Sequence, residues 1–218
     1  MSEPTEISFA KLHAAGNGYI AIDGRGWSAD LGALARAMTD PYTGIGSDGS
    51  LIAEESRTGQ VRMRVFNSDG SESEMSGNGI RLFAKFILDR NIVRAEAGAL
   101  RIETGDGVRT VWPSMRNGVM VAARVAMGAP TFEPEQIPAD TPEQMIETKL
   151  AVGAYEVFER GEGETASSGT GSTAAMIAVR RAGLCADEVK VHLRGGTLSV
   201  AWPGEGEVFL SEIGRAHV

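Results

Sequence analysis

The sequence predicts an α/β protein built from two copies of one module, in which short strands precede a largely buried helix. The first observation is that many of the 28 glycines in this 218-residue chain gather in short loops. The second is a repeated Ser-Gly-x-Gly motif, at residues 76–79 and 168–171. The third is an apolar stretch after each motif, which is typical of a buried helix.

Composition argues against several classes of protein. The formal net charge is −8 and the basic residues are scattered, so binding to nucleic acid or to an anionic membrane is not expected. The polar, acidic start lacks the features of a signal peptide, and no apolar run is long enough to span a bilayer. Cys185 is the only cysteine, which excludes an internal disulfide, and we expect it to be a packed small residue. We therefore expect a cytoplasmic protein.

The first half of the chain shows both hydrophobic periods. Residues 61, 63 and 65 are apolar and alternate with two arginines, which indicates a half-buried strand. Residues 80, 83, 84 and 87 mark one helical face, which Leu82 and Phe86 broaden into that of a buried helix. The expected elements, in order, are a strand pair, a helix, two strands, the buried helix and a second strand pair, at residues 9–23, 31–38, 50–54, 61–65, 80–87 and 100–112.

A second half follows a proposed junction at residues 113–117. It is expected to contain two strands, at 119–125 and 150–157, with a proline-rich loop between them. A helix is then expected to begin after the second glycine motif and to end near Gly183. Two closing strands are expected at 189–193 and 197–202. The predicted domains are therefore residues 1–116 and 117–211. Residues 212–218 resemble a translated sequencing adaptor, and we expect them to be a non-native tail.

The two halves align with each other when residue numbers are shifted by 92. Six of the fifteen positions from 65 to 79 are then identical without a gap, including Ser76 and Ser168. A buried-looking helix follows in both cases, which indicates a duplicated module. Duplication would place two equivalent helix N-termini where they could face one shared site.

Two facing helix N-termini suit one difficult reaction. Their free N–H groups and positive dipole ends favour an anion such as the α-carboxylate of an amino acid. Donors aimed at that carboxylate stabilise the charge that develops when the α-proton is removed. A side chain ahead of each helix could then act as base on one face and acid on the other. The simpler alternative is that Ser76 and Ser168 are only helix N-caps.

The sequence resembles the diaminopimelate epimerase family at residues 11–19, 44–49, 66–81, 159–165 and 168–171, in the family's order. The resemblance implies two pseudo-symmetric α/β domains, each a curved mixed sheet around a central helix, with the substrate between them. It implies an isomerase that interconverts LL- and meso-2,6-diaminopimelate on the bacterial route to lysine, with no pyridoxal phosphate or other cofactor and no metal. The partner is a small amino acid, and the sequence leaves monomer or homodimer open.

The resemblance also assigns site residues. Ser76 and Ser168 occupy the positions of the family's two catalytic cysteines. Four residues match substrate-binding positions of the family: Asn17, Asn67, Glu159 and Arg160. Four more match the residues that bind the α-carboxylate at the helix starts: Gly77, Asn78, Gly169 and Thr170. Taken alone, the two asparagines are typical turn formers and the Glu-Arg pair is typical of a solvated surface.

The chain departs from the family in three ways, and these leave other functions open. Serine replaces both cysteines and is a far weaker acid and base at neutral pH. About fifty residues with an Asn-Pro-His motif are missing, a sizeable part of a domain, and the tail differs. A carboxylate could instead be the base, with candidates Glu72, Glu74, Glu159 and Glu164, as in phenazine-biosynthesis-type isomerases. A third possibility is a non-catalytic amino-acid binder.

Overall fold

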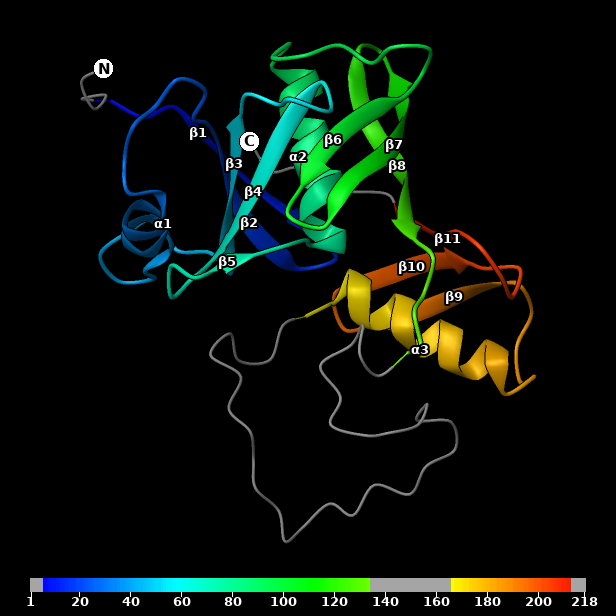
Figure 1. Cartoon of the computed structure of the whole chain (residues 1–218). Coiled ribbons are helices and arrows are strands. Elements are labelled where there is room, and N and C mark those ends of the chain that lie inside the picture. Colours follow the sequence, from blue (N-terminus) through cyan, green and yellow to red (C-terminus); the bar gives the residue numbers. More distant parts are fainter. Residues whose placement is uncertain (1–5, 134–165, 213–218) are drawn as a thin grey trace, which may run out of the picture.

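The computed structural model describes residues 6–133 and 166–212. In that part of the chain, eleven strands form one continuous mixed sheet, and three helices pack on its faces (Figure 1). In chain order they are β1 (Phe9–Ala14), β2 (Asn17–Asp23), α1 (Leu31–Thr39), β3 (Gly49–Glu54), β4 (Val61–Asn67), β5 (Glu72–Ser73), α2 (Gly77–Asp89), β6 (Leu100–Thr104), β7 (Gly107–Arg116), β8 (Val119–Gly128), α3 (Gly169–Arg181), β9 (Glu188–Leu193), β10 (Gly196–Ala201) and β11 (Val208–Glu212).

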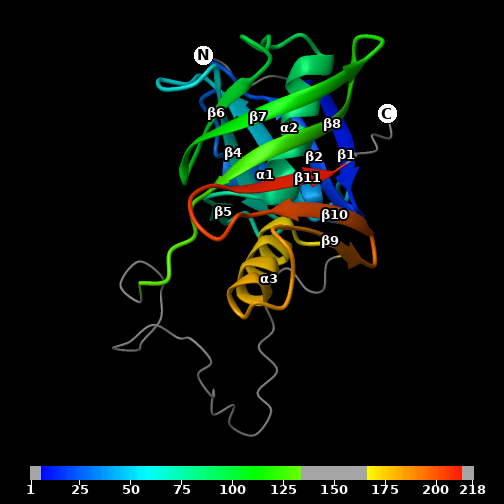
Figure 2. The ribbon, with the colours of Figure 1, turned by 90° about the vertical axis from the view of Figure 1, so that its right-hand side faces the viewer.

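The sheet follows the order β1-β2-β3-β4-β6-β7-β8-β11-β10-β9, with β5 added beside β4. Neighbours are antiparallel except for the pairs β2–β3 and β4–β6, which are parallel. Strands β1 to β8 curl around α2, whereas β9 to β11 lie against α3, as the two views show (Figures 1 and 2). The curved mixed sheet around a helix is the arrangement expected from the sequence.

The helix of the first repeat, α2, is enclosed over most of its length. Every residue from Gly77 to Ile87 is buried, and the apolar side chains of α2 share one core with side chains of β1 to β4 and of β6 to β8. Its largest member, Phe83, has no exposed surface. This explains why the sequence shows apolar residues around most of the helix rather than on a single narrow stripe.

The second repeat covers its helix on one side within the described residues. Met176 and Ile177 of α3 pack on Leu198, Val200 and Leu210, whose strands supply the second core. The opposite side is more open, and Val179 is 42% exposed. Among the described residues, side chains of β9 to β11 share this second core with α3.

The expected junction at residues 113–117 is a hairpin. Strand β7 continues through Pro113 to Arg116, and β8 starts again at Val119. Asn117 and Gly118, with φ of 53° and 78°, make the reversal, and Asn-Gly is a strong signal for such a turn. Strand β8 then pairs with β7 on one side and β11 on the other, so it joins the two repeats.

Strand β11 extends one residue past the boundary expected at 211. Glu212 is its last residue, and its carboxylate accepts a hydrogen bond from Arg81 Nη2 at 2.5 Å. Both side chains are almost fully buried. Burial lowers the pKa of Arg81 to about 10, with Glu212 opposing the shift, so the guanidinium stays charged at neutral pH.

Candidate active site

Each Ser-Gly-x-Gly motif forms the start of a helix. Ser76 caps α2, where its Oγ accepts a hydrogen bond from the Gly79 amide at 2.9 Å. Ser168 caps α3 in the same way, accepting from the Gly171 amide at 3.0 Å. The backbone angles of the two serines agree within a few degrees, with φ of −135° and −134°. The capping role expected for both serines is therefore present, and the two positions are structurally equivalent.

The two helix starts touch through glycine. A Cβ placed on Gly77 would lie 3.1 Å from Gly169 Cα, and one placed on Gly169 would lie 2.9 Å from the carbonyl carbon of Gly77. A side chain at Gly169 would force the backbone of Gly77 to move, and one at Gly77 would be tightly packed against Gly169. Glycine at both positions thus lets the N-terminal ends of two helices, 92 residues apart in sequence, meet backbone to backbone.

The first amides of both helices are available to a ligand. The amides of Ile80 and Ser172 donate to the carbonyls of the two serines, which starts the helical pattern. In the part of the chain that the structure describes, the amides of Gly77, Asn78, Gly169 and Thr170 have no recorded hydrogen-bond acceptor. Such amides, at the positive ends of two helix dipoles, form a strong site for an anion.

A cavity of about 120 Å³ lies where the helix starts meet. Its lining is mostly polar and comes from β2, β4, β5 and the two helix starts: Asn17, Tyr19, Val65, Asn67, Ser73, Met75, Ser76, Gly77, Asn78, Ser167, Ser168, Gly169 and Thr170. All eight of the predicted site residues that fall within the described ranges line this one cavity. Glu159 and Arg160 lie outside the described residues.

Sequence reasoning missed several lining residues, and Tyr19 and Ser167 are two of them that make specific contacts. Tyr19 Oη lies 3.0 Å from Ser76 Oγ. Ser167 Oγ accepts a hydrogen bond from Asn78 Nδ2 at 2.8 Å and donates to the Ala14 carbonyl at 3.2 Å. The only hint in the sequence is adjacency: Tyr19 follows a glycine loop and Ser167 precedes the second motif.

Asn78 links the two repeats inside the protein. It is 2% exposed, and its amide nitrogen donates to Ser167, the residue before the cap of α3. Its side-chain oxygen accepts from Arg81 Nη2 at 2.6 Å. This buried network fixes the start of α2 relative to the chain that enters α3.

Asn17 begins β2 and Asn67 ends β4, and hydrogen bonds hold both side chains. Asn17 Nδ2 donates to Asp48 at 3.4 Å. Asn67 Nδ2 donates to Ser71 Oγ, and its Oδ1 accepts from Ser73 Oγ, both at 3.0 Å. The turn-forming role considered for Asn67 is present, since its carbonyl also accepts from the Gly70 amide. Both side chains nevertheless line the cavity.

The carboxylates considered as alternative bases do not reach the cavity where they are described. Glu72 is exposed and forms an ion pair with Arg64, which lowers the pKa of Glu72 and makes it a weaker base. Glu74 is exposed, and it is not among the lining residues. Glu159 and Glu164 lie outside the described residues. The described lining thus offers hydroxyl and amide groups but no carboxylate.

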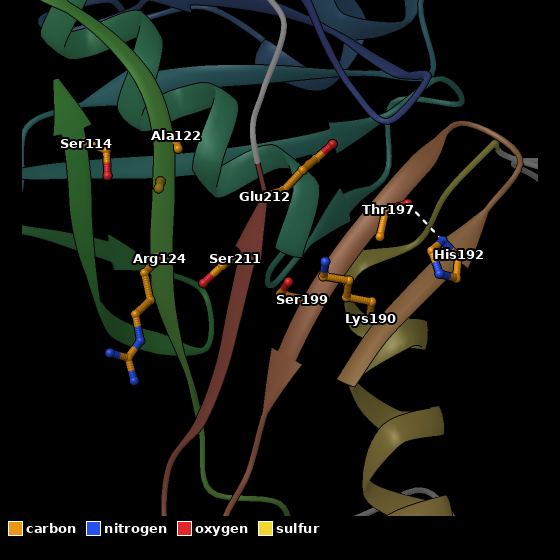
Figure 3. Close-up of a pocket in the computed structure, with 10 residues that line it drawn as sticks. Ser114, Ala122, Arg124, Lys190, His192, Thr197, Ser199, Ser211 and Glu212 are labelled. Carbon is orange, nitrogen blue, oxygen red and sulfur yellow. Dashed lines mark hydrogen bonds between the residues drawn. The ribbon is translucent and has the colours of Figure 1, made fainter. Parts of the chain in front are cut away.

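A second cavity, of about 490 Å³, lies among β7 to β11 (Figure 3). Polar and charged side chains line it, but most of its wall surface is apolar. His192 Nδ1 lies 3.0 Å from Thr197 Oγ1. It contains neither helix start, and the neighbours of Thr197 and Ser199 along β10, Leu198 and Val200, pack on α3 instead. The larger cavity is therefore not the candidate site, because both helix starts and the eight predicted site residues lie at the smaller one.

Two further findings concern metal binding and membrane-spanning helices. Among the described residues, no group of three or more His, Cys, Asp or Glu side chains is placed to hold a metal ion. No helix in the same ranges is long and apolar enough to cross a membrane.

Comparison with solved structures agrees with the fold. A hydroxyproline epimerase from Agrobacterium vitis has a similar structure, with a TM-score of 0.68 at 12% identity, covering 97% of this chain and 91% of that one. A PhzF-family phenazine biosynthesis protein from Bacillus anthracis gives a TM-score of 0.64 at 13% identity, covering 96% and 95%. These likenesses confirm the predicted fold class.

Sequence comparison identifies the family. The diaminopimelate epimerase of Clostridium perfringens is 31% identical over 257 aligned positions, which cover 92% of this chain and 94% of the relative. The alignment is longer than the chain itself, so the relative has residues without a counterpart here. A model of the diaminopimelate epimerase family matches residues 9–133 and again residues 138–218. The chain therefore belongs to the diaminopimelate epimerase family of isomerases.

Proposed function

We propose that this protein epimerises one α-carbon of 2,6-diaminopimelate, between the LL and meso forms, by a two-base mechanism without a cofactor. One observation carries the proposal: the eight described residues assigned by the family resemblance line a single cavity at two touching helix starts. The curated relative from Clostridium perfringens carries the name of this activity.

In this proposal the substrate's α-carboxylate binds the free amides of Gly77, Asn78, Gly169 and Thr170. The two helix dipoles then stabilise the negative charge that spreads onto the carboxylate when the α-proton leaves. The substrate is a small amino acid of the cytoplasm. The rest of it is bound by Asn17, Asn67, Glu159 and Arg160.

Ser76 and Ser168 approach the α-carbon from opposite sides. One hydroxyl group passes its own proton to a hydroxide ion and takes the α-proton. The other donates its proton to the opposite face and is reprotonated by water, which restores the hydroxide ion, and the centre is inverted. Serine is a poor base without a neighbour to take its proton, so turnover is expected to be slow compared with cysteine-containing relatives.

The test is deuterium uptake by LL-diaminopimelate in D₂O with the purified full chain, followed by NMR, with other free amino acids as a parallel panel. We expect slow uptake at the α-position together with formation of the meso isomer, and none from the panel. Uptake by another amino acid in preference would favour the carboxylate-dependent isomerase. Thermal stabilisation by diaminopimelate without any uptake would favour the non-catalytic binder and contradict the proposal.

A further inference from the structure

The two serines differ in one respect that the duplication does not predict. Tyr19 Oη lies 3.0 Å from Ser76 Oγ, and both residues line the cavity. The recorded side-chain neighbour of the Ser168 hydroxyl, within the described residues, is Thr170 Oγ1 at 3.5 Å. A phenol therefore contacts the hydroxyl of one helix cap, and an aliphatic hydroxyl lies near the other.

The position of Tyr19 is set by the sheet. Tyr19 of β2 pairs with Gly49 of the parallel strand β3. A Cβ on Gly49 would lie 2.9 Å from a carbon of the Tyr19 ring, so the ring packs against a backbone that has no side chain. Asp48 holds the same segment, because its carboxylate accepts a hydrogen bond from the Gly18 amide at 2.7 Å. These contacts keep the phenol directed at Ser76.

A phenol changes what the Ser76 hydroxyl can do. The pKa of tyrosine is near 10 in model compounds, far below that of an aliphatic alcohol, so tyrosine can exchange a proton that serine alone holds tightly. A hydrogen bond of 3.0 Å between two oxygens is short enough for this exchange.

We propose that Tyr19 is a positioning residue that supplies the proton passed on by Ser76, an inference that rests on the proposed function. When the face of the α-carbon next to Ser76 is protonated, the Ser76 O–H bond breaks and a C–H bond forms. The Ser76 oxygen then takes the proton of Tyr19, which becomes a tyrosinate and is reprotonated by water. In the reverse direction a hydroxide ion takes the proton of Tyr19, the tyrosinate takes the proton of Ser76, and the Ser76 oxygen takes the α-proton as the C–H bond breaks.

A thiol in place of each serine reports on this contact without any turnover. In a Cys185→Ser background, we would compare Ser76→Cys and Ser168→Cys, each with and without Tyr19→Phe, and measure thiol pKa from the pH dependence of alkylation. A hydrogen bond from the phenol favours the thiolate. We expect Tyr19→Phe to raise the pKa of the thiol introduced by Ser76→Cys by about one unit, and to leave that introduced by Ser168→Cys unchanged.

The second arm uses the full chain with its serines. Tyr19→Phe is expected to reduce the rate of deuterium uptake by about 10²-fold with little change in KM, since the phenyl ring still fills its place. An unchanged thiol pKa for Ser76→Cys, or an equal change at both sites, would overturn the inference. Absence of uptake in the parent chain would contradict the proposed function instead, and the thiol measurement would still decide the role of Tyr19.

Discussion

The variant Ser76→Cys/Ser168→Cys is expected to exchange the α-proton of diaminopimelate about 10²-fold faster than the parent chain or more, the scale of one well-placed acid or base. A free thiol titrates near pH 8.5, and a helix N-terminus lowers that value further. Both positions are such termini, with extended backbone angles that any side chain can adopt. Replacing the two caps is expected to cost about 1 kcal/mol each in stability.

The measurement is deuterium uptake by NMR for the parent, both single variants and the double variant. Ser73→Cys is the matched control, because Ser73 lines the same cavity but does not cap a helix. We expect no gain from the control and the full gain only with both cysteines. No gain in the double variant, while diaminopimelate still stabilises it, would show that serine is not what limits turnover. The residues that the longer relatives have and this chain lacks would then be the next cause to examine.

The variant Asn78→Ala is expected to lower the free energy of unfolding by about 3 kcal/mol, because it removes one buried neutral hydrogen bond and one buried hydrogen bond to a charged group. Ser167 would lose the donor at 2.8 Å, and Arg81 would lose an acceptor at 2.6 Å. The Arg81 guanidinium is the costlier loss, since two of its other nitrogen atoms already lack partners in the described structure. The start of α2 would also lose its connection to the chain that enters α3.

Urea denaturation monitored by circular dichroism measures this effect. Gln60→Ala is the control, since Gln60 also makes two side-chain hydrogen bonds, to Arg94 and Arg101, but in a water-accessible place. We expect the control to cost about 1 kcal/mol or less. Equal losses for the two variants would mean that Asn78 is not an internal link between the repeats.

The sequence predicted that the two helix starts are equivalent because the pattern that forms each start is local. Ser76 and Ser168 are each followed by glycine and a helix-forming stretch, and a cap needs only the three residues after it. The shift of 92 residues then predicted that these starts would be related in space. In the structure they touch at Gly77 and Gly169. This contact could not be predicted from the sequence alone.

Contacts that depend on strand register were not predictable. Tyr19 and Ser76 are 57 residues apart, and Asn78 and Ser167 are 89 apart. Each pair meets only because of the order and curvature of the sheet, which single-residue patterns do not specify. At residues 113–117, where the sequence predicted a domain junction, the Asn117-Gly118 turn returns the chain into the same sheet.

The most direct test of the proposed carboxylate site is a titration of the ¹⁵N-labelled full chain with diaminopimelate, followed by amide NMR. We expect the amides of Gly77, Asn78, Gly169 and Thr170 to shift together and saturate with one Kd, because both helix starts bind one carboxylate. Shifts at one helix start only would contradict it. So would shifts confined to the second cavity, around His192.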